Sequence, residues 1–188
     1  ERAIALEDDE EIELAIKRIL LIHSVIFSIG GIPLIYLNDE IGILNDYGYE
    51  NDTSKAYDNR WVHRPKTDWV LLEKRHDPKT IEGHIFAKLQ QLRTLRQSMP
   101  VLAGNDMRVI HTTSPHVLGY MRGFGTPQRL IVLANFSEET QELDSRLLAG
   151  YGMSLDVVDL IEDKPIVNSS QPLVLEPYQY MWITKRQL

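Results

Sequence analysis

Two neighbouring carboxylic acids, Asp39 and Glu40, stand where a chemical role is most readily suspected. They follow the short apolar run Ile32–Leu37, from which Asn38 separates them. Two carboxyl groups can divide acid and base roles only if both reach the same bond. Adjacent residues at a strand end point to opposite sides, so we expect Asp39 and Glu40 to support the structure without reacting.

Arg60 is the sharper candidate, in a stretch of nearly forty residues rich in Asn, Asp, Gly and aromatics. A guanidinium stays charged, and its fixed fork can grip a carboxylate through two hydrogen bonds. The alternative is an arginine that only holds its own loop in place. Arg64, beside Pro65, is expected to anchor the loop or to face solvent.

The aromatic residues of this stretch offer a second kind of contact. Tyr47 and Trp61, with Tyr49 and Tyr57 nearby, could place flat apolar faces against a ligand while their polar tips form hydrogen bonds with it. They could equally form a small core within the loop. The six histidines show no metal-ligand spacing, so we predict no metal and no cofactor.

The elements that must position these residues begin with a helix over residues 8–29, where apolar residues recur at helical spacing. Ile32–Leu37 has the profile of a strand buried on both faces, as in a parallel sheet. After the long loop, Asp77 and Pro78 are predicted to start a second helix that ends at Ser98.

Beyond Pro100 the pattern changes to short extended runs separated by turn-forming residues, which is typical of an antiparallel sandwich. We therefore predict two domains, residues 1–99 and residues 100–188. The predicted strands are Met107–Thr112, His116–Gly123, Arg129–Phe136, Thr140–Leu143, Leu155–Leu160, Leu173–Leu175 and Tyr180–Lys185.

Residues 31–42, GIPLIYLNDEIG, resemble the segment at the last barrel strand of the α-amylase superfamily. Leu44-Asn45-Asp46 and residues 59–65, NRWVHRP, are similar to the amylosucrase branch, as are Leu133–Ser137 and Leu175–Gln179 in the predicted sandwich. Asn38 stands where that family usually has Gly. Because Asn tolerates the left-handed conformation, we expect the turn to survive.

The resemblance implies an α+β fold class: the last β/α portion of a TIM (β/α)8 barrel followed by an antiparallel C-terminal β-sandwich. It implies an enzyme that cleaves sucrose by a retaining mechanism and transfers glucose to an α-1,4-glucan. Arg60 would close the glucose pocket by pairing with a carboxylate from another barrel loop, and Trp61 and Tyr47 would also bind the sugar. The catalytic carboxylates of the family would lie upstream, so we expect no catalytic residue here and no activity from this chain alone.

Two alternatives stay open. The full protein could be a sucrose hydrolase or another glycosidase of the superfamily, and the chain by itself could be a non-catalytic module associated with carbohydrate. A net charge of −7 argues against nucleic acid or an anionic membrane as partner. The absence of cysteine permits a reducing compartment, and a start at Glu1 without a signal pattern suggests a piece of a longer, cytoplasmic protein.

Overall fold

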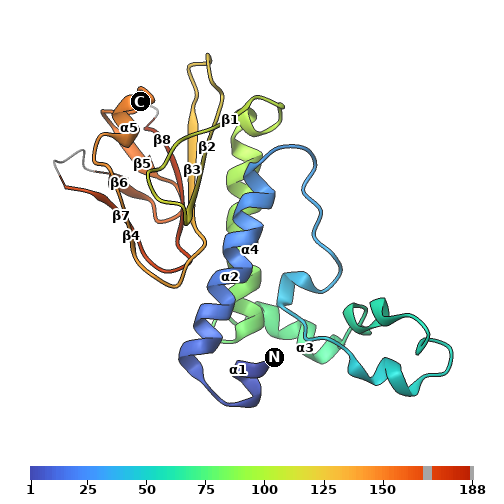
Figure 1. Cartoon of the computed structure of the whole chain (residues 1–188). Helices are drawn as coiled ribbons and strands as arrows, with labels where there is room; N and C mark the ends of the chain where they lie inside the picture. Colours follow the sequence, from blue (N-terminus) through green and yellow to red (C-terminus); the bar gives the residue numbers. More distant parts are fainter. Residues whose placement is uncertain (167–170, 187–188) are drawn as a thin grey trace. The chain divides into compact units, whose positions relative to one another are not determined.

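The computed structural model describes residues 1–166 and 171–186, which form two compact units (Figure 1). One unit comprises Glu1–Ile16 and Ile35–Leu89, and the other comprises Lys17–Leu34 and Gln90–Leu188. The division passes through both long helices, because each helix contributes one part to each unit. A domain boundary between residues 99 and 100 stays a prediction.

The two long helices are confirmed as α2 (Asp9–Ser28) and α4 (Ile81–Ser98). The predicted start of α4 at Asp77 and Pro78 is wrong, because Asp77 instead accepts a hydrogen bond from Lys79 N within a preceding turn. Thr80 Oγ1 accepts from Gly83 N at 3.0 Å and so caps the helix. No helix among the described residues is both long and apolar enough to cross a membrane.

Three short helices were not expected from the sequence: α1 (Arg2–Ala5), α3 (Trp69–Glu73) and α5 (Leu147–Gly150). Each is only one turn or slightly longer, which is too short to show a clear apolar period. For α3 a local signal was present, since the Asp68 side chain accepts from Val70 N and Leu71 N at its start.

All paired strands of the described chain are antiparallel, as predicted. The larger sheet has the order β1-β2-β3-β8-β5-β6, and the smaller sheet pairs β4 with β7. Only β6 was not predicted. The strands are β1 (Met107–Val109), β2 (Val117–Arg122), β3 (Leu130–Asn135), β4 (Gln141–Leu143), β5 (Val157–Asp159), β6 (Lys164–Ile166), β7 (Leu173–Leu175) and β8 (Tyr180–Lys185).

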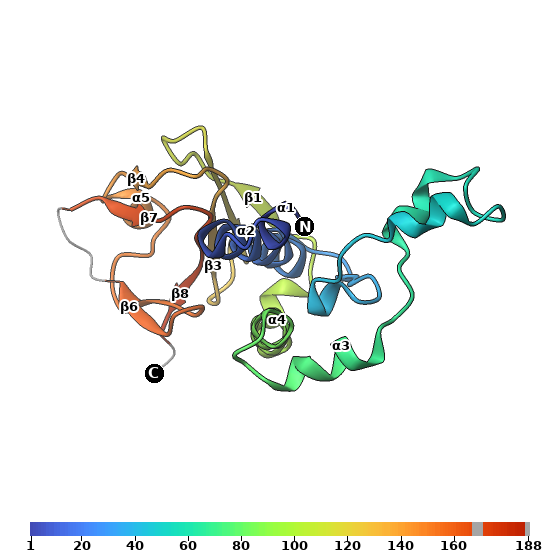
Figure 2. The ribbon, with the colours of Figure 1, turned by 90° about the horizontal axis from the view of Figure 1, so that it is seen from below.

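The central strand β3 is buried along its whole length, because the larger sheet is covered on both faces at this strand. On one face, Ile131 and Leu133 join Leu143 of β4 and Leu175 of β7 in a single apolar core. On the other, the C-terminal part of α2 lies against the sheet (Figure 2), where Trp182 Nε1 donates to Ser24 Oγ at 2.9 Å. This packing explains why the sequence of β3 shows no alternation.

Two arginines hold the C-terminal end of α2. Arg96 donates to the carbonyls of Phe27 and Gly31, and Arg122, fully buried, donates from Nη1 to Ser28 O at 3.0 Å. Arg122 also donates to Asp106 O at 2.7 Å and to Gly104 O. These positive groups satisfy carbonyls that a helix end leaves unpaired.

The prediction that Ile32–Leu37 forms a strand is wrong. These residues form no strand, and within the described chain no segment pairs with them. Ile32 and Leu34 are 97% and 80% exposed. A parallel strand requires hydrogen-bonded neighbours from other β/α units, and the described chain contains none. The antiparallel part of the predicted fold is therefore confirmed, whereas residues 1–166 and 171–186 show no barrel.

Candidate functional site

The loop that follows residue 38 is built from turns closed by aspartate side chains. Asp46 accepts from Gly48 N at 2.9 Å, Asp52 from Ser54 N at 2.9 Å and Asp58 from Arg60 N at 3.0 Å. Asp46 and Asp58 precede two 3-10 helices, Tyr47–Asn51 and Asn59–His63. Such turns satisfy backbone groups locally, which allows a long segment to be ordered without helix or sheet.

Asn38 opens the loop in the left-handed conformation, with φ of 74°. The expectation that asparagine would preserve the turn is confirmed. Asn38 is only 2% exposed, and its Oδ1 has no hydrogen-bond partner among the described residues. A short 3-10 helix, Asp39–Ile41, follows, and Gly42 ends it with φ of 64°.

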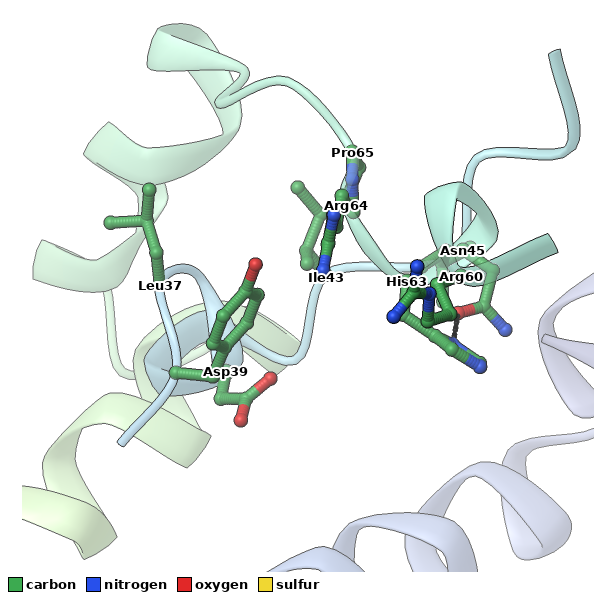
Figure 3. Close-up of a pocket in the computed structure, with 10 residues that line it drawn as sticks. Leu37, Asp39, Ile43, Asn45, Arg60, His63, Arg64 and Pro65 are labelled. Atoms are coloured by element: carbon green, nitrogen blue, oxygen red, sulfur yellow. Dashed lines mark hydrogen bonds between the residues drawn. The ribbon is translucent and has the colours of Figure 1, made fainter. Parts of the chain in front are cut away.

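A pocket of about 510 Å³ lies between this opening turn and the end of the loop (Figure 3). Leu37 and Asp39 lie on one side of it, and Asn45, Arg60 and His63 gather on the other. His63 Nδ1 is 2.9 Å from Asn45 Oδ1. The lining residues are Tyr36, Leu37, Asp39, Ile43, Leu44, Asn45, Arg60, His63, Arg64 and Pro65.

Arg60 contributes to this pocket and forms an ion pair within its own turn. Its Nε lies 2.9 Å from Asp58 Oδ1, and its Nη2 lies 2.8 Å from Asp58 Oδ2. The guanidinium holds the pKa of Asp58 down to about 2, chiefly through these side-chain hydrogen bonds. The carboxylate of Asp58 was not singled out from the sequence, and the predicted pairing of Arg60 with a distant carboxylate stays a prediction.

Trp61 and Tyr47 do not line the pocket. The Trp61 ring lies close to two cations, with Lys55 Nζ 5.2 Å and the Arg64 guanidinium carbon 5.3 Å from its centroid. This arrangement favours a small core within the loop. Tyr47 is 58% exposed, and its hydroxyl donates to Glu1 Oε2 at 2.9 Å. Binding of sugar by either residue stays a prediction.

The two neighbouring carboxylates do not enter the pocket together. Asp39 lines it, whereas Glu40 does not. Among residues 1–166 and 171–186, no group of three or more His, Cys, Asp or Glu side chains could hold a metal ion. The residues that sequence reasoning missed are Asn45 and His63 as a pair and Asp58. The Asp-x-Arg spacing was the available signal for Asp58.

Residues 107–184, which run from the start of β1 to the last residue but one of β8, match the family model of the amylosucrase C-terminal domain. The likeness to amylosucrases therefore concerns this C-terminal part of the chain. In this amylosucrase-like region the matched residues comprise the strands, and the pocket lies outside them.

The relatives of this amylosucrase-like region are longer enzymes. A glucosylglycerate phosphorylase of Escherichia coli (strain K12) is 28% identical over 88% of the chain and 28% of its own length. The α-amylase from Geobacillus thermoleovorans, solved with acarbose, aligns over 92% of this chain and 34% of its own, with 21% identity and a TM-score of 0.62. The trehalose-6-phosphate hydrolase from Bacillus licheniformis aligns over 90% of this chain and 39% of its own, with 18% identity and a TM-score of 0.59.

These likenesses support different conclusions. The structural matches establish the fold, and the chain spans well under half of each relative. By their names these relatives are a phosphorylase, an α-amylase and a hydrolase, and the chain is similar to part of each.

Proposed function

We propose that this chain is the C-terminal part of an amylosucrase-like glucosyltransferase. The full enzyme would cleave sucrose through a covalent glucosyl-enzyme and pass the glucosyl unit to an α-1,4-glucan. The observation that carries the proposal is the pocket at the start and end of the loop, because Asn45, Arg60 and His63 of the amylosucrase-like motifs all line it.

In this mechanism the chain binds and orients the sugar. Arg60 supplies N–H donors at the pocket wall, and Asn45 and His63 form a second polar group beside it. Retaining chemistry needs two carboxyl groups about 5–5.5 Å apart on either side of the glycosidic bond. We assign those carboxyl groups to parts of the enzyme outside this chain. Water is kept from the intermediate when the glucosyl unit fills a closed pocket.

Two other enzyme functions differ from this proposal in the molecule that takes the glucosyl unit. In a sucrose hydrolase, water takes the glucosyl unit. In a phosphorylase, inorganic phosphate takes it, and the similarity to the glucosylglycerate phosphorylase of Escherichia coli favours testing this second candidate.

The experiment uses the full-length protein with sucrose, with and without glycogen and with and without inorganic phosphate. The proposed transferase releases fructose and lengthens the glucan, with little free glucose. Free glucose equal to fructose under all conditions would identify a hydrolase, and glucose 1-phosphate formed only with phosphate would identify a phosphorylase. Absence of fructose release from sucrose, whatever the acceptor, would contradict the proposal.

A further inference from the structure

The side chains of the ion pair between Asp58 and Arg60 differ in their exposure to solvent, which suggests that they have different roles. The Asp58 side chain is 15% exposed, whereas the Arg60 side chain is 74% exposed. Asp58 Oδ1 accepts from both the backbone N and the Nε of Arg60, and Oδ2 accepts from Nη2. The carboxylate is therefore fixed by the turn, and the guanidinium is fixed by the carboxylate.

The contacts occupy one edge of the guanidinium only. A guanidinium has five N–H donors in a plane, and Asp58 takes those on the Nε and Nη2 side. The described part of the chain provides no hydrogen-bond partner for Nη1. The second edge, formed by Nη1 and the remaining Nη2 hydrogen, can donate to another acceptor, such as paired sugar hydroxyls or a second carboxylate.

We propose that Asp58 is a positioning residue, which holds Arg60 in one orientation so that the Nη1 and Nη2 edge is offered to a glucosyl group in the pocket. The proposal rests on the proposed function. A flexible arginine loses side-chain entropy when it binds a sugar. If Asp58 already restricts Arg60 in the free protein, this entropy is not lost again on binding. The pair is neutral overall, which suits an uncharged sugar.

The chain contains a matched pair for comparison. Asp144 and Arg146 have the same spacing, and Asp144 Oδ1 likewise accepts from Arg146 N at 2.8 Å. Their side-chain contacts are longer, at 3.4 Å and 3.3 Å, and Asp144 is 41% exposed. The same Asp-x-Arg motif thus forms a looser pair on the sandwich and a tighter, less exposed pair beside the pocket. The motif alone does not determine how closely the two side chains approach.

The test is a double-mutant cycle in the full-length enzyme with sucrose. Asp58→Asn keeps an oxygen for the turn but removes the charge, and we expect kcat/KM to fall about tenfold with no change in Tm. In an Arg60→Ala background, Asp58→Asn should cause no further loss. Asp144→Asn is the control and should leave kcat/KM unchanged. Unchanged cleavage in Asp58→Asn, or an equal loss in the Arg60→Ala background, would overturn the proposal.

A second readout does not depend on the substrate. Phenylglyoxal modifies arginine, and peptide mass mapping gives the rate at each arginine of the full-length protein. We expect Asp58→Asn to raise the rate at Arg60 several-fold while the rate at Arg64, packed beside Trp61 in the same loop, stays constant. If sucrose is not cleaved by the parent protein, the proposed function fails, and this rate still tests Asp58. An unchanged rate at Arg60, or an equal rise at Arg64, would show that Asp58 does not position Arg60.

Discussion

Arg60 is the residue on which the proposed function depends most directly. In the full-length enzyme, Arg60→Ala removes the donors at the pocket wall, and we expect kcat/KM for sucrose to fall at least tenfold, on the order of the loss of one preorganised contact. Arg60→Lys should recover only part, because an ammonium cannot reproduce the two-pronged grip. Sucrose cleavage and thermal unfolding are measured side by side.

The melting temperature should change little in both variants, because Arg60 is exposed and lies in a loop. Arg146→Ala, which alters an exposed arginine of the sandwich, is the matched control. Cleavage close to that of the parent in Arg60→Ala would reduce Arg60 to a surface residue. A large fall in melting temperature with a proportionate loss of activity would make its role structural.

Asp159 gives a prediction about pH. It is 2% exposed, and its Oδ1 accepts from the backbone N of Ile161 and Trp182, at 3.1 Å and 3.0 Å. Its Oδ2 has no partner among the described residues. Burial raises the pKa of Asp159, so the folded state holds the proton more tightly than the unfolded state. This contribution to stability is present at low pH and is lost as pH rises through the folded pKa.

Asp159→Asn should remove the loss of stability that the ionisation of Asp159 causes as pH rises, since the amide cannot ionise. The difference in unfolding free energy between variant and parent should then change between pH 4 and pH 7 in favour of the variant, by at most about 1.4 kcal/mol per pH unit for one proton. Urea unfolding across this range measures it. Asp156→Asn, at an exposed neighbouring position, is the control. A constant difference at all pH values would show that Asp159 titrates alike in both states.

For single residues, the sequence predicted the structure where the feature depends on the residue's own backbone conformation. Asn38 was expected to adopt the left-handed turn, and it does. The pairing of Asp58 with Arg60 depends on how the turn brings the two side chains together. The prediction of a distant carboxylate partner for Arg60 therefore did not include Asp58, two positions away. The burial of Asp159 likewise follows from tertiary packing, which its sequence neighbours do not reveal.

At the scale of the elements, the end of α2 is held in part by one buried side chain, that of Arg122. Arg122 donates to the carbonyls of Ser28, Gly104 and Asp106 while fully buried. Arg122→Met keeps much of the volume but leaves these acceptors unpaired, and we expect a loss of about 3 kcal/mol or more in unfolding free energy. Urea unfolding of the chain, at constant m value, measures this loss.

Arg146→Met, at an arginine whose side chain is 87% exposed, should change stability by less than about 1 kcal/mol. Equal effects at the two positions would mean that the carbonyls at the end of α2 find water or other donors when Arg122 is removed. Gly30 shows how closely Arg122 approaches, because a Cβ atom there would lie 3.0 Å from its Nη1.

The elements also show which sequence patterns were sufficient. Helical periodicity predicted α2 and α4 because each buries one stripe of its own surface. The runs around β2, β3 and β8 were found because they are long and apolar. Ile32–Leu37 has an equally apolar sequence, but a strand forms only when a second segment pairs with it, and no described segment pairs with these residues.

For the whole molecule, we predict that the 188-residue chain alone neither releases fructose from sucrose nor lengthens glycogen. The covalent intermediate requires carboxyl groups that we assign to the rest of the enzyme. Fructose is assayed against the full-length protein as positive control and a heat-inactivated chain as negative control. Fructose above the inactivated control would contradict the assignment of all catalytic carboxylates outside the chain.

The same chain should also associate, because Ile32, Leu34 and Leu37 are largely exposed and lie close together in the sequence. We expect it to bind a hydrophobic dye and to form larger species as concentration rises, as seen by light scattering. Replacing Ile32 and Leu34 by Thr should reduce both effects. A chain that stays monomeric at high concentration without binding dye would show that this segment is covered in solution.

The aspartate-closed turns of the loop have a consequence for the order in which the protein folds. Each turn joins residues only two positions apart, at Asp46, Asp52 and Asp58. The sheet, in contrast, pairs Leu130 with Thr184, and such distant pairing is slow because a long stretch of chain must first be brought together. The turns that shape the pocket can therefore form early in folding, before β3 and β8 meet.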